Sequence, residues 1–134
     1  MSKQPKFSLD DYLQHIHEAA ALILEYTTGM SKETFLGDRK TQQAVLMNLM
    51  VLGEATALLR NEHPDFVASH PEVEWNKIRG MRNIMAHEYW AINMGIVWET
   101  AISKIPTLHD TLATVIAGRR DNAGGLPQNS NGAG

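Results

Sequence analysis

Cysteine is absent from this sequence, and basic residues are outnumbered by acidic ones. Without cysteine the chain cannot form disulfide scaffolds, thiolate metal sites, thiol nucleophiles or cysteine-based redox switches. The 12 lysines and arginines face 15 aspartates and glutamates, which gives a formal net charge of −3. A protein that coats nucleic acid non-specifically needs a strongly basic surface, so any contact with nucleic acid must come from a local patch.

Long hydrophobic runs are absent as well. No stretch without a charged residue exceeds 13 residues, the length of 41–53, whereas a membrane-spanning helix needs about 20. Residues 1–11 lack the apolar core of a secretory signal peptide. These features predict a cytoplasmic protein that does not associate with a membrane.

The composition that remains is typical of one folded domain. The chain has 134 residues, of which 43% are hydrophobic and 20% charged, and this balance is that of a globular protein with room for one core. Residues 118–134 are rich in Gly, Asn and Ala and contain Leu126 as their only large apolar residue. We therefore expect a helical domain over residues 1–117 and a disordered tail over residues 118–134.

Apolar residues recur at intervals of three and four, which predicts amphipathic helices. Ser8 and Asp11 resemble a capping signal for the first helix, and Gly29 suits its exit. Pro106 lacks an amide hydrogen and should kink or break the last helix. No segment supports a β-sheet, so we expect an all-α, up-and-down bundle of four or five helices. The four main helices should cover about 9–27, 39–61, 75–90 and the segment after Asn93.

The segment 75–90 carries the candidate functional residues. Lys77, Arg79 and Arg82 place three positive charges on a short stretch of an acidic chain. On an ideal helix, Asn83 and His87 share one side of the polar face with Arg79, and Arg82 lies about 140° from His87. Arginine for phosphate, asparagine for orientation and histidine for proton transfer are what phosphodiester cleavage in RNA requires. The simpler interpretation is a solvated outer face of an amphipathic helix.

Three other groups of residues have more ordinary interpretations. The histidines outside this segment show no metal-ligand spacing, so we expect no metal site. The methionines at helical spacing should fill the core, and the three tryptophans should pack at helix ends or an interface rather than stack on bases. Glu54 lies within an apolar run, where a buried carboxylate needs a partner, and an arginine of segment 75–90 is the expected one. These methionines are Met47, Met50, Met81 and Met85, and the tryptophans are Trp75, Trp90 and Trp98.

The pattern Arg82-Asn-x-x-x-His87-x-Tyr89 resembles the signature motif of the HEPN superfamily, in its branch of HepT-type toxins. The resemblance extends over roughly residues 8–116. Outside the motif it rests on Gly53-Glu54-Ala55, His63-Pro64, Trp75, Met81, Val97-Trp98 and Ile105-Pro106-x-Leu108.

The resemblance implies a HEPN-type bundle that acts as a metal-independent endoribonuclease without a cofactor. Such proteins are toxins of type VII-like toxin–antitoxin pairs, in which the antitoxin is a minimal nucleotidyltransferase of the MNT type. They form homodimers, or higher oligomers, whose motif helices face each other across a twofold axis. The antitoxin transfers AMP to the tyrosine of the motif, here Tyr89, and the added negative charge would block RNA.

The resemblance also suggests a role for each candidate residue. His87 would act as general base on the 2′-hydroxyl or as acid to the leaving oxygen, and Arg82 would bind the scissile phosphate. Asn83 would orient one of these groups, Arg79 and Lys77 would hold flanking phosphates, and Glu54 would give structural support. Two alternatives stay open: a non-catalytic module that binds the nucleotidyltransferase, and a substrate-presenting subunit of a nucleotidyltransferase enzyme.

Overall fold

The structure is a computed structural model that describes residues 7–83 and 89–133, with the side chains of these residues except Tyr89 and 123–133. The described part is helical throughout and contains no strand, which confirms the all-α helical bundle. The chain also contains a 3₁₀ turn at Tyr89–Ala91 and a π-helical turn at Thr100–Lys104. The α-helices are α1 (Leu9–Thr27), α2 (Lys32–Leu36), α3 (Arg39–Glu62), α4 (Pro64–Ser69), α5 (Trp75–Met81), α6 (Met94–Glu99) and α7 (Ile105–Ala133).

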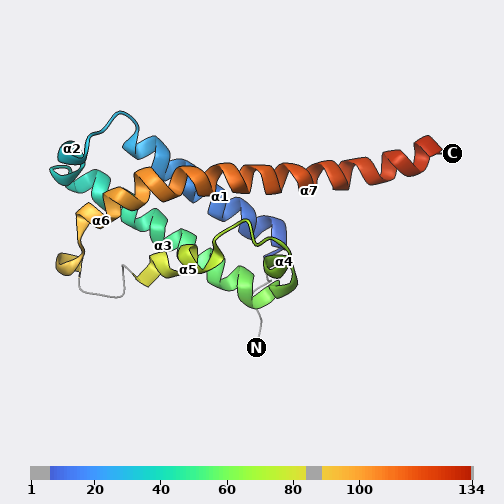
Figure 1. Ribbon diagram of the computed structural model, residues 1–134, viewed down its shortest axis with the longest axis horizontal. Coiled ribbons are helices and arrows are strands. Elements are labelled where there is room, and N and C mark those ends of the chain that lie inside the picture. The colour runs from blue at the N-terminus through green and yellow to red at the C-terminus, as the bar shows by residue number, and fades with distance from the viewer. Residues whose placement is uncertain (1–6, 84–88, 134) are drawn as a thin grey trace.

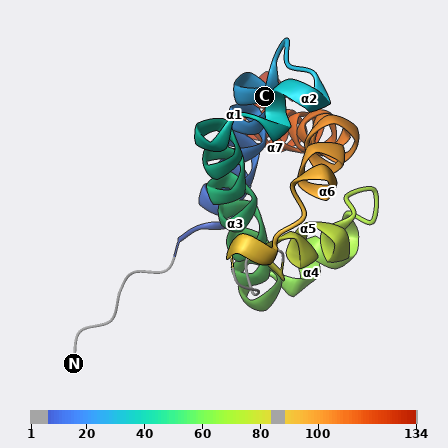
Figure 2. The same cartoon turned by 90° about the vertical axis from the view of Figure 1, so that its left-hand side faces the viewer.

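Three long helices form the body of the bundle. Helix α1 packs against both α3 and α7, and the short α5 packs on α3 (Figures 1 and 2). The C-terminal part of α7 extends past the other helices (Figure 1). No helix in the described ranges is long and apolar enough to cross a membrane.

The predicted bounds of the first two long helices are confirmed. At the start of α1 the Ser8 hydroxyl accepts a hydrogen bond from the Asp11 amide at 3.1 Å, and the Asp11 carboxylate accepts one from the Ser8 amide at 3.0 Å. Gly29 follows α1 with a φ of +76°, a conformation that glycine adopts without steric cost. Asp38 caps α3 through the Thr41 amide. These local signals fix the helix ends because they satisfy amides that the helix leaves unpaired.

The packing predicted for the methionines and tryptophans is only partly confirmed. Met81, Trp75 and Trp98 are buried as expected. Met47 is 55% exposed, however, and Met50 is also exposed, so the prediction that they fill the core is wrong. They lie on a face of α3 that neither α1 nor α5 covers, because Leu46, Leu49 and Leu52 already fill the space toward the core. The described side chain of Trp90 is 82% exposed.

The third predicted helix is shorter than expected. Its α-helical part ends at Met81, and Arg82 and Asn83 follow in a tighter turn. The Arg82 amide donates to the carbonyl of Gly80, so the regular helical pattern is interrupted there. Met85, which was predicted to fill the core, lies outside the described residues.

Pro106 perturbs the last helix without breaking it. The backbone widens into the π-helical turn Thr100–Lys104 directly before α7, and the Ile105 amide donates to the Thr100 carbonyl, five residues back. Proline cannot donate to the helical ladder and its ring crowds the preceding turn, and a wider turn relieves that crowding.

The boundary predicted at Gly118 falls inside α7, whose backbone is helical through Ala133. Arg119 donates a hydrogen bond to Asp10 of α1 at 2.6 Å and places its guanidinium 5.6 Å from the ring centre of Phe66 in α4. The packed part of the chain therefore extends at least one residue past Gly118, because this ion pair and cation–π contact hold Arg119 on the bundle.

Candidate functional site

Helix α5 presents an apolar face to the bundle and a basic face to solvent. Trp75, Ile78 and Met81 recur every three residues and are buried. The Trp75 indole N–H donates to a backbone carbonyl, that of His70, at 2.9 Å, which fixes the start of the helix. Arg79 is exposed, so α5 is anchored by three apolar side chains and carries its positive charge outward.

The chain approaches α3 very closely where α5 ends. A Cβ atom built on Gly53 would lie 2.5 Å from the Cβ of Arg82 and 2.8 Å from its amide nitrogen. Any side chain at position 53 would thus overlap the backbone of Arg82. Gly53 allows the contact that sets the position of Arg82 against the middle of α3. In the sequence, Gly53 stands out only as part of the family resemblance, and its contact with Arg82 is visible only in the folded chain.

The next residue of α3 binds the arginine side chain. Nη1 of Arg82 donates to Oε1 of Glu54 at 2.8 Å, which confirms the predicted pairing. The expectation that Glu54 is buried is wrong, since the side chains of Glu54 and Arg82 are 57% and 44% exposed. Glu54 faces outward because the Gly53 side of α3 is the one that meets α5. The bond to Glu54 uses one N–H group of the guanidinium, whose other N–H groups can bind a phosphate.

The other residues of the motif are only partly placed. Asn83 is exposed directly after Arg82. His87 lies outside the described residues, and Tyr89 is placed by its backbone alone, at the start of the 3₁₀ turn Tyr89–Ala91. The structure therefore places Arg82 beside Glu54, with Asn83 next to it in the chain, and the roles predicted for Asn83, His87 and Tyr89 stay predictions.

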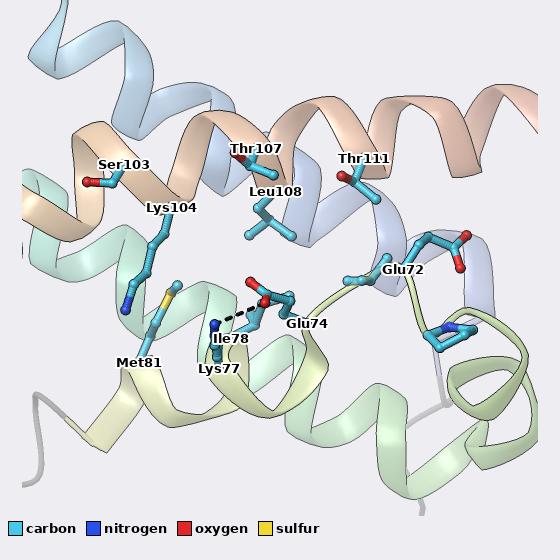
Figure 3. Close-up of a pocket in the computed structure, with 12 residues that line it drawn as sticks. Glu72, Glu74, Lys77, Ile78, Met81, Ser103, Lys104, Thr107, Leu108 and Thr111 are labelled. Atoms are coloured by element: carbon cyan, nitrogen blue, oxygen red, sulfur yellow. Dashed lines mark hydrogen bonds and ion pairs between the residues drawn. The ribbon is translucent and has the colours of Figure 1, made fainter.

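The two flanking basic residues point to different sides of α5. Lys77 pairs with Glu74 at 3.0 Å and lines a cavity of about 330 Å³ between α5 and α7, whereas Arg79 does not line it (Figure 3). Lys104, the last residue of the π-helical turn before α7, extends across the same cavity toward Met81 (Figure 3). Sequence reasoning missed the α7 wall of this cavity, although Ser103, Thr107 and Thr111 recur every four residues as a helical face would require.

A second hollow lies on the outer face of α3. Met50, Val51 and Leu58 line it together with Phe7 and with Glu54, so the ion pair to Arg82 adjoins an exposed apolar groove. Contiguous exposed apolar surface of this kind often marks a site of protein association. We call these four apolar residues and Met47 the α3 groove.

Comparison with known proteins identifies the family to which this arrangement belongs. The model of the family described as "Ribonuclease HepT-like" matches residues 16–115. This chain belongs to the HepT-like family. The matched range contains Gly53, Glu54 and Arg82, so the close approach and the ion pair lie within the part that the family shares.

Two archaeal relatives match this chain over about the same length. A Thermococcus cleftensis protein named "Probable ribonuclease HepT" is 40% identical over 103 residues, which cover 77% of this chain and 91% of the relative. A Methanocaldococcus jannaschii protein named as a candidate RNase is 36% identical over 102 residues, covering 76% of this chain and 82% of the relative. No solved structure matches. The HepT-like identity thus rests on sequence over nearly the whole packed region.

Proposed function

We propose that this chain is an endoribonuclease of the HepT type, with Arg82 and His87 at its catalytic centre. The observation that carries the proposal is the position of Arg82: Gly53 fixes its backbone, Glu54 holds one N–H group, and the guanidinium stays open to solvent. An arginine held in this way is prepared to bind a phosphate, because little side-chain freedom is lost when the substrate arrives.

The proposed reaction uses the nucleophile that RNA itself contains. The 2′-hydroxyl attacks the adjacent phosphorus and loses its proton to a general base, while the 5′-oxygen of the next nucleotide leaves and takes up a proton. His87 would act as the base or the acid, and Arg82 would bind the non-bridging oxygens, where negative charge accumulates. Asn83 would orient one of these groups, and Arg79 and Lys77 would contact flanking phosphates. The products would be a 2′,3′-cyclic phosphate and a free 5′-hydroxyl, with no metal or cofactor required.

The proposal includes a homodimer, or a higher oligomer, built on the α3 groove. An interface there would bury apolar side chains that a single chain leaves in water, and would bring two Glu54–Arg82 pairs near a shared axis. The two motif segments would then form one cleft.

Regulation by a partner completes the proposal. A cognate MNT-type nucleotidyltransferase would act as antitoxin in the cytoplasm and transfer AMP to Tyr89. Tyr89 lies seven residues after Arg82, and a phosphate added near the cleft would repel the RNA backbone over about 8 Å at physiological salt. The chain would thus be the toxin of a two-gene pair.

Incubation of purified protein with total RNA in EDTA tests this function. Wild-type protein should cleave RNA and leave cyclic phosphate ends, His87→Ala should not, and the partner with ATP should silence the wild type in proportion to AMP on Tyr89. Cleavage that needs magnesium would contradict the mechanism. A protein that binds the partner but never cleaves RNA would instead support the interaction module or the substrate-presenting subunit.

A further inference from the structure

The cavity between α5 and α7 has an apolar floor and a polar rim (Figure 3). The buried side chains of Val73, Ile78, Met81 and Leu108 form the floor. Its volume of about 330 Å³ lies at the lower end of the range of about 300–1,000 Å³ in which small organic groups bind. The proposed cleavage chemistry uses none of the floor residues.

We propose that this cavity receives one nucleobase of the RNA substrate, so that the enzyme holds and reads a nucleotide near the scissile bond. The inference rests on the proposed ribonuclease function and adds a base-binding subsite to it. RNA-binding proteins recognise single strands by splaying bases out of the stack and binding their faces and edges. An apolar floor with polar groups at its edge suits both parts of a base.

The rim provides donors and acceptors on opposite walls. On the α5 side, Glu74 and Lys77 lie 3.0 Å apart and offer a carboxylate acceptor beside an ammonium donor. On the α7 side, Thr107 and Thr111 offer hydroxyl groups, which can donate or accept. Base edges carry the same mixture of groups, so a base would find partners that an alkyl ligand would not.

Lys104 extends the site toward the RNA backbone. The cavity and a neighbouring hollow of about 380 Å³ share Ser103 and Lys104 in their linings, and Lys32 also lines that hollow. Neither lysine forms an ion pair with any residue in the described ranges. One ammonium group at the mouth of the cavity and a second in the adjoining hollow, neither of them paired with a described residue, are suited to phosphates of the strand that carries the bound base.

The cavity also adjoins the proposed catalytic arginine. Met81 forms part of the floor and is followed directly by Arg82, whose side chain turns the other way, toward α3. A strand with one base in the cavity would reach Arg82 by passing around the C-terminal end of α5, where Met81 is followed by Arg82. This juxtaposition favours a nucleotide of the substrate over an unrelated small molecule.

The test uses single-stranded oligonucleotides with 2′-fluoro sugars, which lack the nucleophile and cannot be cleaved. The base is removed at one position at a time, and binding to full-length protein is measured for each oligonucleotide. For wild-type protein, removal of one particular base should weaken binding about tenfold, because contacts of one base with a protein surface typically contribute on this scale.

Two variants of the cavity wall sharpen the test. Thr107→Gln puts a longer side chain at the rim of the cavity, from an exposed position of α7. In this variant, removal of the sensitive base should weaken oligonucleotide binding by less than twofold. Lys104→Gln should weaken all oligonucleotides alike and keep the sensitivity to that base. Thr114→Gln is the matched control, because Thr114 is exposed on α7 and lies outside the cavity lining. It should behave as wild type.

An unchanged base effect in Thr107→Gln, or no sensitive position in wild type, would overturn the proposal. Mononucleotides that bind more tightly than the oligonucleotides, with no sensitive position, would assign the cavity to a free nucleotide and also overturn it. The two levels of inference fail separately. If unmodified RNA is never cut, the ribonuclease function fails while the base effect can still be measured. If RNA is cut and the base effect is absent, the base-binding subsite alone fails.

Discussion

Among the described residues, two ion pairs join distant parts of the chain, and they differ in what surrounds them. Arg82 pairs with Glu54, 28 residues away, at 2.8 Å, and Arg119 pairs with Asp10, 109 residues away, at 2.6 Å. Beside Glu54, Gly53 lets the backbone of Arg82 lie directly on α3. Arg119 makes only side-chain contacts, with Asp10 and the ring of Phe66.

The comparison separates positioning from stabilisation. An exposed ion pair contributes about 0–1 kcal/mol to stability, so neither pair holds the fold together by itself. What distinguishes Arg82 is that its backbone, and not only its side chain, lies directly against α3. We therefore expect changes at Gly53 and Glu54 to affect cleavage, and changes at Asp10 and Arg119 to affect stability alone.

The largest effect should come from Gly53→Ala. The new Cβ would overlap Arg82, which must shift, and we expect a loss of about 1–3 kcal/mol in the free energy of unfolding. Cleavage of RNA should fall at least tenfold, since misplaced catalytic groups lose rate steeply. Urea unfolding and a cleavage assay measure both.

The matched control for this substitution is Gly80→Ala. A Cβ at Gly80 would meet no atom within 4 Å, and alanine favours the helix, so stability should stay equal or rise by up to about 1 kcal/mol. If Gly53→Ala behaves like Gly80→Ala, the close approach does not position Arg82.

A smaller effect is expected from removal of the charge on Glu54. Glu54→Gln should lower the rate of RNA cleavage several-fold, because the guanidinium is held less firmly, and change stability by less than about 1 kcal/mol. Asp10→Asn is the corresponding change in the other pair and should leave the cleavage rate within twofold. Equal effects of both substitutions on cleavage would remove the distinction between the pairs.

The second pair can be tested by two truncations of α7. A chain that ends at Gly118 lacks Arg119, and we expect it to be about 1 kcal/mol less stable than a chain that ends at Arg120. Thermal or urea unfolding of both chains measures the difference. Two truncations of equal stability would show that Arg119 contributes nothing and would favour the tail boundary at 118 expected from composition.

The smallest effect is a pH dependence at Asp10. The hydrogen bond from Arg119 lowers the pKa of the Asp10 carboxyl below its usual 3.8. The pair therefore stabilises the fold above about pH 4 and loses this contribution as the pH falls through the lowered pKa. The difference in unfolding free energy between wild type and Asp10→Asn should shrink between pH 5 and pH 3. A difference that is constant over this range would contradict the assignment.

The sequence predicted the parts of this fold that depend on local chemistry. Ser8 and Asp38 cap their helices because their side chains bond to amides three residues away, a relation visible in the sequence alone. The pairing of Glu54 with an arginine of segment 75–90 was also predicted, although the burial of Glu54 on which that prediction rested is wrong, because the carboxylate is exposed.

The features that sequence reasoning missed depend on how helices pack. Met47 has the spacing of a core residue, yet its face of α3 is uncovered within one chain. Gly53 has no side chain, so no sequence pattern predicts its contact with Arg82. The α-helix α5 ends at Met81 although the apolar periodicity of the sequence continues. Each of these facts depends on where a second helix or backbone segment lies, which periodicity does not specify.

The rate of RNA cleavage by Arg82→Ala, relative to Arg39→Ala, tests the central claim most directly. Arg39 is an exposed arginine at the start of α3, so its removal controls for the loss of one positive charge. With purified proteins in EDTA, Arg39→Ala should cleave at the wild-type rate. Arg82→Ala should be at least about 100-fold slower, as expected for loss of a group that binds the transition state. Equal rates for the two variants would contradict the account, because the arginine held by Gly53 and Glu54 would then have no part in the reaction.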